Sequence, residues 1–197
     1  MPNPVRLFHV PPSPFARKCR VVIRERGVEG IEEVSVDTAA MPKDLLGANP
    51  LGQIPALEFD DGSALFDSPV ICAFLETLGQ GPRLTRQDDF PLLRRQALGD
   101  GIGELAVKLR YDQIRPQGEQ SPTVQARWRK ALLRGLDVAE AEGGPEARFD
   151  IGEIALACSL GYIDFRHGDI AWREGRPYLT ALVERLAQRP SFQATRV

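Results

Sequence analysis

Residues 1–79 alternate between short apolar runs and amphipathic stretches. Apolar runs typical of strands occur at Val5 to Val10, Val34 to Val36, Ala56 to Phe59 and Ala64 to Phe66. Apolar residues at helical spacing fill residues 14–26 and the stretch after Ser68, and a glycine ends each of them, Gly27 and Gly79. The turn Asp60-Asp61-Gly62-Ser63 suits a hairpin between the last two strands. The pattern therefore predicts the order βαβ, a loop with two prolines, then ββα.

Two parts of this region carry finer expectations. Residues 38–48 are interpreted as irregular, with a helical turn around residues 44–46 as the only regular structure. In the helix after Ser68, the spacing predicts a buried face formed by Val70, Ile71, Phe74, Leu75 and Leu78.

The second half of the chain has a helical pattern almost throughout. Four helices are predicted, at residues 90–114, 122–142, 151–165 and 176–188. The change of pattern comes at Gly79-Gln80-Gly81-Pro82, which has the composition of a linker. We therefore expect an N-terminal domain at residues 1–79, a linker at 80–89 and an all-helical domain at 90–197.

The start of the third predicted helix has a specific capping pattern. Asp150 suits the N-cap and Glu153 the third helical position, so the pair has the spacing of a capping box. Phe149 and Ile154 have the spacing of a hydrophobic staple. Residues 154–161 are apolar or small nearly all round, which predicts the central buried helix of a bundle.

Composition and charge exclude several classes of protein. The 197 residues carry a formal net charge of -2, and the isoelectric point is near 5.8, which argues against nucleic acid or an anionic membrane as the main partner. No apolar run has the length of a membrane span or the pattern of a signal peptide. The three cysteines, Cys19, Cys72 and Cys158, are widely spaced and have no partnered histidines. This favours reduced cytosolic thiols over disulfides or a zinc site, and a cytoplasmic protein.

The dipeptide Ser-Pro occurs twice, as Ser13-Pro14 and Ser68-Pro69, each time between a predicted strand and a predicted helix. Serine is a preferred N-cap because its hydroxyl accepts a hydrogen bond from a first-turn N–H, and proline suits the next position because its fixed φ is helical. A helix start attracts anions through its unpaired N–H groups and the positive end of its dipole. Two such starts can hold one small molecule with two negative groups if the fold brings them together.

Four features combine into a recognisable order. They are Ser-Pro-Phe-x-Arg-Lys on the first helix, Asn49-Pro50-Leu51-Gly52-Gln53-Ile54-Pro55 before the hairpin, Asp67-Ser68 before the next helix, and the helical second half. Over essentially the whole chain this order resembles the cytosolic glutathione transferases, and most of all their short bacterial members of the YibF type. The resemblance implies the glutathione transferase fold, an α/β N-terminal thioredoxin-like domain plus an all-α C-terminal helical bundle. It also implies a homodimer in which Asp100 or Glu104 of one subunit approaches glutathione in the other.

The resemblance further implies glutathione as co-substrate, with no metal. Ser13 would donate its hydroxyl to the glutathione thiolate, in a setting that lowers a thiol pKa from about 8.5. A cis Ile54-Pro55 bond would turn the backbone of Ile54 toward the cysteinyl unit. Asp67 would bind the γ-glutamyl ammonium and Ser68 the γ-glutamyl carboxylate. The glutathione-binding set implied is Phe15, Gln53, Ile54, Pro55, Asp67 and Ser68.

Each of these assignments has a structural alternative. Ser13 can serve only as a helix cap. Pro55 can simply begin a strand, which is a permitted place for proline. A carboxylate such as that of Asp67 at a helix start is also ordinary capping chemistry.

By the same resemblance, the electrophile site would include His9, Pro12, Lys108, Tyr111 and Asp112. The alternatives are a satisfied strand histidine for His9 and a solvated helix surface for the charged residues. The implied activity is transfer of the glutathione thiolate to a small electrophile, or reduction of a peroxide, in detoxification. A binding or regulatory protein of this fold with little or no turnover is the alternative. Glutathione-dependent isomerisation or dehalogenation is a third possibility.

Position 13 also departs from related proteins. Serine stands there in place of the nucleophilic cysteine of glutaredoxins and omega transferases. Thiol-disulfide exchange requires a thiolate in the protein, so we expect a poor glutaredoxin. Cys19 lies too far along the first helix, on its apolar face, to substitute.

Overall fold

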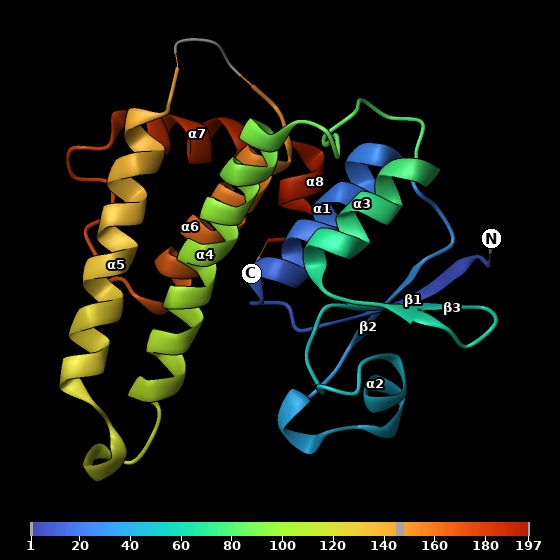
Figure 1. Ribbon diagram of the computed structural model, residues 1–197, viewed down its shortest axis with the longest axis horizontal. Coiled ribbons are helices and arrows are strands. Elements are labelled where there is room, and N and C mark those ends of the chain that lie inside the picture. Colours follow the sequence, from blue (N-terminus) through green and yellow to red (C-terminus); the bar gives the residue numbers. More distant parts are fainter. Residues whose placement is uncertain (1, 145–147, 197) are drawn as a thin grey trace. The chain divides into compact units, whose positions relative to one another are not determined.

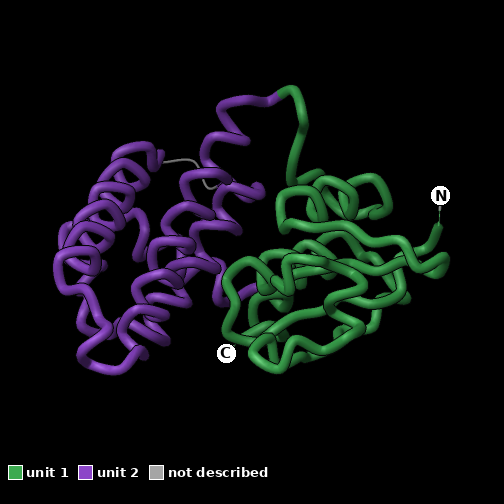
Figure 2. Tube along the Cα trace, turned by 60° about the horizontal axis from the view of Figure 1, so that its bottom comes forward, with its two compact units in different colours: residues 1–88, 190–197 green, residues 89–189 purple. Residues whose placement is uncertain are grey.

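The computed structural model describes residues 2–144 and 148–196. The chain divides into two compact units. Unit 1 comprises Met1–Asp88 and Pro190–Val197, and unit 2 comprises Asp89–Arg189 (Figure 2). This division falls after Asp88, within the segment predicted as a linker, and it groups the end of the chain, which was assigned to the helical domain, with unit 1.

Unit 1 is built on a four-stranded sheet in the order β2-β1-β3-β4. The central strand β1 (Pro4–His9) runs parallel to β2 (Glu32–Ser35) and antiparallel to β3 (Ala56–Phe59), which pairs with the short β4 (Ala64–Leu65). Helices α1 (Pro14–Arg26) and α3 (Ser68–Leu78) lie side by side over one face, and α2 (Lys43–Ala48) covers the other (Figure 1). Phe8 packs with Leu45 and Ala48 on the α2 face.

The sequence predictions for α1 are confirmed at both ends. The helix spans Pro14–Arg26, and Gly27 ends it with φ of 63°, a left-handed conformation that glycine adopts without steric cost. Residues 38–48 have more regular structure than the sequence analysis predicted. A 3-10 turn (Thr38–Ala40) and the helix α2 occupy most of that segment, because Leu45 and Ala48 find a core position against the sheet.

The predicted buried face of α3 is only half right. Ile71 and Leu75 are fully buried, but Val70 is 43% exposed and Leu78 is 37% exposed. Helical spacing gives the apolar stripe its width, whereas the neighbouring elements decide how much of the stripe is covered. Cys72, which the spacing did not select, takes a buried position instead.

Unit 2 consists of α4 (Phe90–Gln113), a 3-10 turn (Gln117–Glu119), α5 (Pro122–Ala141), α6 (Ile151–Arg166) and α7 (Pro177–Ala187). The central position predicted for α6 is confirmed, since every residue from 151 to 160 is buried. Gly99 allows close approach of α4, because a Cβ there would lie 2.7 Å from the backbone N of Leu156. The Ser159 hydroxyl donates to the Gly99 carbonyl at 2.8 Å. No helix among the described residues is both long and apolar enough to cross a membrane.

The capping pattern at the start of α6 forms only in part. The Asp150 carboxylate accepts from the Glu153 N–H at 3.0 Å, as an N-cap should. The Glu153 side chain does not reach back as a capping box requires. It accepts instead from the Tyr178 hydroxyl and from Arg185, each at 3.0 Å. Burial raises the pKa of Glu153, and burial with the adjacent Glu153 charge raises the pKa of Tyr178 to about 12.

The short helix α8 (Pro190–Gln193) packs against α1 within unit 1. The Arg17 guanidinium donates to the Phe192 carbonyl at 3.3 Å, and the Ser191 hydroxyl donates to Glu25 at 2.5 Å. These contacts explain why residues after 189 group with the N-terminal unit, a pairing over more than 160 positions that no local pattern reveals.

Candidate functional site

The start of α1 follows directly from the central strand. The Ser13 N–H donates to the Val10 carbonyl at 2.9 Å, which closes a tight turn after β1. The Ser13 hydroxyl accepts from the Ala16 N–H at 3.2 Å, so Ser13 is the N-cap and Pro14 the first helical residue, as predicted. A hydroxyl has one hydrogen to donate besides its lone pairs. Capping therefore leaves the Ser13 hydroxyl hydrogen available for an anion.

The start of α3 differs from the prediction by one residue. Asp67, not Ser68, is the N-cap, and Ser68 is the first helical residue with Pro69 after it. The Asp67 carboxylate makes no capping bond, and its side chain has no hydrogen-bond or ion-pair partner within residues 2–144 and 148–196. Asp67 is exposed whereas Ser68 is 2% exposed. A charged group thus stands unpaired at a helix start.

A compact loop leads into β3. The Asn49 side chain accepts from the Leu51 N–H at 3.0 Å and donates to the Gln53 carbonyl at 2.8 Å. Gly52 adopts φ of 63°, and a Cβ there would lie 2.6 Å from the Met41 side chain. The Ile54-Pro55 bond is cis, as the sequence analysis expected.

These three segments meet at one end of unit 1. Phe8 pairs with Ala56 in the antiparallel strands β1 and β3, so the residues after β1 and those before β3 lie at the same end of the sheet. The Cys19 thiol of α1 contacts the Ser68 carbonyl at 3.8 Å, which brings the start of α3 against α1. Of the predicted glutathione residues, Pro55 and Ser68 are buried, Phe15 and Ile54 are half-buried, and Gln53 and Asp67 are exposed. The fold thus gathers two helix starts and an ordered loop.

His9 ends β1 and is 5% exposed. Its Nδ1 atom is buried without a hydrogen-bond partner among the residues described. Burial lowers the pKa of His9, and the positive charge of Arg20 lowers it further. His9 is therefore a neutral core histidine at neutral pH, and Pro12 beyond it is half-buried.

The remaining predicted residues belong to α4 in unit 2. Lys108 and Tyr111 share its exposed surface, and Lys108 pairs with Glu104 at 2.7 Å. Asp112, one helical turn after Lys108, is only 7% exposed. Its carboxylate accepts from the Gln125 side chain at 2.7 Å and from the Ser121 N–H at 3.0 Å, and these hydrogen bonds lower its pKa. Asp112 thus connects α4 to the start of α5.

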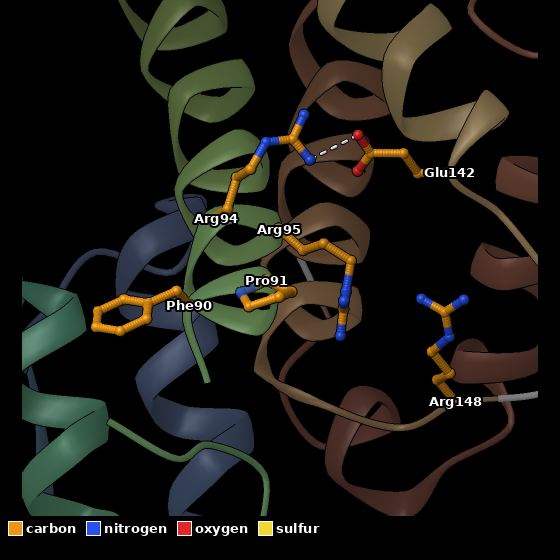
Figure 3. A pocket seen from close by; sticks show the side chains of 6 residues that line it. All are labelled: Phe90, Pro91, Arg94, Arg95, Glu142 and Arg148. Atoms are coloured by element: carbon orange, nitrogen blue, oxygen red, sulfur yellow. Dashed lines mark hydrogen bonds and ion pairs between the residues drawn. The ribbon is translucent and has the colours of Figure 1, made fainter. Parts of the chain in front are cut away.

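Two surface hollows lie in unit 2, and none of the predicted site residues lines either of them. One, of about 580 Å³ at the start of α4, is lined by Phe90, Pro91, Arg94, Arg95, Glu142 and Arg148 (Figure 3). There the Arg94 guanidinium points toward Glu142 and pairs with it at 2.6 Å. The other, of about 600 Å³ on α5, is lined by Pro122, Thr123, Ala126, Arg127, Lys130 and Arg134. No group of three or more potential metal ligands exists within the described residues.

One positioning residue was missed from sequence. Asn49 was quoted only as part of a motif, yet its side chain shapes the loop that carries Gln53 and Ile54. The signal was present, because asparagine before Pro-x-Gly favours a turn closed by its own side chain.

Comparisons with known proteins agree with this arrangement. Residues 12–78 match the family model of the glutathione S-transferase N-terminal domain, and residues 122–185 match that of the C-terminal domain. The uncharacterized GST-like protein YibF of Escherichia coli (strain K12) is 34% identical over 192 residues, which cover 93% of this chain and 94% of YibF.

Solved structures give the same result. A glutathione transferase family member from Pseudomonas fluorescens Pf-5, with bound glutathione, has a TM-score of 0.91 and 38% identity, covering 97% of this chain and 98% of that one. A glutathione S-transferase from Methylobacillus flagellatus KT with GSH bound has a TM-score of 0.89 and 30% identity, covering 97% of this chain and 98% of that one.

Proposed function

Because the chain belongs to the glutathione S-transferase family, we propose that it binds glutathione and transfers the glutathione thiolate to a small electrophile, or uses it to reduce a peroxide. The observation that carries this proposal is the start of α1, where the Ser13 hydroxyl caps the helix and keeps a hydrogen for an anion. Glutathione bound in the similar solved structures supports the choice of ligand.

Ser13 acts in this proposal as a stabiliser of the sulfur anion. A hydrogen-bond donor at the positive end of a helix favours the thiolate over the thiol and lowers the thiol pKa. More thiolate at neutral pH gives a faster nucleophilic attack. Ser13 itself forms no covalent bond to the substrate.

The rest of glutathione is held by unit 1. The backbone of Ile54, next to Pro55, pairs with the cysteinyl unit, with Phe15 and Gln53 nearby. The unpaired carboxylate of Asp67 binds the γ-glutamyl ammonium, and the Ser68 hydroxyl with the α3 N–H groups binds the γ-glutamyl carboxylate. The absence of a capping bond from Asp67 supports this role, because its carboxylate is not already engaged.

For the electrophile, we retain Pro12, which is half-buried close to Ser13 in the sequence. We also retain Lys108 and Tyr111, which are exposed on α4. We also keep His9 in the proposed site, as a neutral and buried residue next to the turn that precedes Ser13. Asp112 makes two hydrogen bonds that connect α4 to the start of α5. Its role in this proposal is therefore to hold the α4 residues in position.

We further propose a cytoplasmic homodimer. The exposed apolar side chains of Phe66 and Val70 in unit 1 and of Phe90 in unit 2 support an oligomer, because a second copy would cover them. In it, Asp100 or Glu104 of one subunit approaches glutathione of the other. Three reduced, buried cysteines support a reducing compartment.

The first experiment is a calorimetric titration with glutathione, combined with thiolate absorbance of the bound ligand across pH, for the parent and Ser13→Ala. We expect both proteins to bind glutathione, with the thiol ionising at lower pH only in the parent. The matched control is Ser63→Ala, a serine in the hairpin turn of the same unit.

The outcomes separate the two functions. If the parent binds glutathione and Ser13→Ala leaves thiol ionisation unchanged, the catalytic role of Ser13 is wrong and the chain is better described as a binding or regulatory protein. If the parent binds no glutathione, the proposed function fails as a whole. A lowered thiol pKa that depends on Ser13 justifies a screen of electrophiles and peroxides, with isomerisation and dehalogenation substrates included.

A further inference from the structure

Cys19 and Cys72 form a buried thiol pair between α1 and α3, which run side by side (Figure 1). Their Sγ atoms lie 3.9 Å apart, and the two residues are 0% and 1% exposed. The third cysteine, Cys158, lies on α6 in unit 2. Because Cys19 and Cys72 are 53 positions apart in the sequence, no local pattern indicates this pairing.

The pair adjoins the helix starts that the proposed function uses. Cys19 lies in the second turn of α1, after Ser13, and Cys72 lies in the second turn of α3, after Ser68. The Cys19 thiol donates to the Ser68 carbonyl, with 3.8 Å between Sγ and oxygen. Any movement of these sulfurs therefore acts directly on the first turn of α3.

We propose that Cys19 and Cys72 are a modification site, where a small hydroperoxide forms a reversible disulfide that weakens glutathione binding. The effect on binding rests on the proposed function, whereas the disulfide does not. The pair is coupled to the site through the first turn of α3.

The chemistry balances with a hydroperoxide as the oxidant. The first sulfur, as thiolate, attacks a peroxide oxygen, the O–O bond breaks and a sulfenic acid forms. The departing oxygen takes up a proton and leaves as water from hydrogen peroxide, or as an alcohol from an alkyl hydroperoxide. The second sulfur attacks the sulfenic sulfur; the S–S bond forms, the S–O bond breaks, and water leaves. Two electrons pass from the thiols to the peroxide. Two thiol groups of a small reductant such as dithiothreitol reverse the change and leave as the disulfide of that reductant.

Burial selects the size of the oxidant. Side chains that are 0% and 1% exposed admit a reagent only during local opening of the packed helices. A water-sized hydroperoxide needs a smaller opening than a tripeptide disulfide does. We therefore assign the oxidation to hydrogen peroxide or a similarly small hydroperoxide.

The disulfide is expected to displace the start of α3. A disulfide holds its sulfurs about 2.05 Å apart, so the two sulfurs must approach from 3.9 Å. At the far ends, Arg26 of α1 ties the helices together by donating to the Glu76 carbonyl at 3.1 Å and the Gly79 carbonyl at 2.5 Å. Because these C-terminal ends are held together, we expect the sulfurs to approach each other through movement of the N-terminal ends of the two helices.

Helix α1 is held on its other side as well. Arg17 and Glu25 are both bonded to the α8 segment. The first turn of α3 has no comparable restraint at Asp67, whose side chain is unpaired among the described residues. The shift therefore moves Asp67 and Ser68, the residues proposed to hold the γ-glutamyl end.

The test treats the full-length protein with hydrogen peroxide, removes the peroxide, and then measures two things. A tryptic peptide map under non-reducing conditions should show the Cys19 peptide joined to the Cys72 peptide, with loss of two hydrogens and reversal by dithiothreitol. Calorimetry with S-methylglutathione, which cannot reduce the disulfide, should show about tenfold weaker binding, the loss of roughly one charge-assisted hydrogen bond.

The variants separate this site from general oxidation. Cys158→Ala keeps the pair and should behave as the parent does. Cys72→Ala, with Cys19→Ala as a second variant if the first does not fold, should form no link and bind S-methylglutathione equally well before and after peroxide.

Two results overturn the proposal: no Cys19–Cys72 link in the parent and in Cys158→Ala, or a link that leaves binding of S-methylglutathione unchanged. If the reduced parent binds no S-methylglutathione, the proposed function fails, and with it the effect on binding. The peptide map still decides the disulfide in that case.

Discussion

The starts of α1 and α3 carry the same dipeptide, Ser-Pro, but use it differently. In α1, Ser13 is the N-cap and its hydroxyl accepts from a first-turn N–H. In α3, the helix begins one residue earlier, Asp67 occupies the N-cap position without making a side-chain cap, and Ser68 is buried. The difference shows that a helix-start motif fixes the place of a helix but not which side chain is left for a ligand.

The difference also suits two kinds of ligand group. A half-buried hydroxyl that caps its helix and keeps one hydrogen offers a single, well-placed donor, which fits a sulfur anion. An exposed, unpaired carboxylate beside a buried serine offers both signs of partner, which fits an amino acid end with its ammonium and carboxylate. If this comparison is right, substitutions at the two starts should affect different steps.

The largest effect is expected at Ser13. Ser13→Ala should lower kcat for conjugation of glutathione to chlorodinitrobenzene by about a hundredfold, since a preorganised donor to a reacting anion contributes on that scale. KM for glutathione should change little, because the rest of the tripeptide keeps its contacts. Steady-state kinetics check this, with Ser63→Ala as control. A KM effect at constant kcat would mean that Ser13 only helps to bind.

The opposite split is expected at Asp67. Asp67→Asn keeps the shape and removes the charge that we propose binds the γ-glutamyl ammonium, so KM for glutathione should rise about tenfold with kcat nearly unchanged. The same kinetics measure it, with Asp61→Asn in the hairpin turn as the matched carboxylate. Equal losses of kcat at Ser13 and Asp67 would erase the distinction between the two helix starts.

Substitutions at the two helix starts should also differ in their effect on the free energy of unfolding, with the larger loss at Ser13. Ser13→Ala removes a real capping bond and should lower the free energy of unfolding by about 1 kcal/mol. Asp67→Ala removes no capping bond, so only the attraction to the helix dipole is lost, about 0.3 kcal/mol. Urea unfolding of the parent and both variants provides the comparison. A larger loss for Asp67→Ala would show that its carboxylate caps α3 after all.

The smallest effect concerns His9, just before the turn to Ser13. Burial and Arg20 lower its pKa in the folded protein below the usual value of about 6.5, with Arg24 acting in the same direction and Glu33 against it. The unfolded chain therefore binds the proton more readily, and the free energy of unfolding falls as pH drops below about 6.5. In His9→Gln this part of the slope should disappear.

Urea unfolding between about pH 7.5 and about pH 5.5 measures the slope. The second histidine, His167, is also buried with a lowered pKa, so His167→Gln is the matched control from unit 2. An unchanged slope in His9→Gln would mean that His9 is not held neutral near the α1 start.

Much of the fold follows from local signals in the sequence. Ser13 and Gly27 bracket α1 as expected, and the apolar character of residues 154–161 marks α6 as central, because capping, positive φ and periodicity act within a few residues. Val70 and Leu78 were misjudged since exposure depends on which elements cover a helix, and that depends on distant parts of the chain.

The candidate site divides in the same way. Ser13 and Asp67-Ser68 were proposed as site residues from motifs, and the family resemblance implied the cis Ile54-Pro55 bond, which the structure has. The role of Asp112 in holding α5 was not predicted, because its partners lie nine and thirteen positions away. Glu153 was assigned to a capping box and binds Tyr178 and Arg185 instead, since a buried carboxylate takes the strongest donors that the packing brings near.

The sequence by itself determined most of the helices and strands, the family, and the residues proposed to bind glutathione, because those depend on short-range geometry and on motifs of fixed order. Only the tertiary structure decided that the Asp67 side chain has no partner among the described residues, that α8 packs against α1, and that Cys19 lies next to Cys72. These facts arise from contacts between residues far apart in the chain, where packing chooses among many partners that local chemistry leaves equally possible.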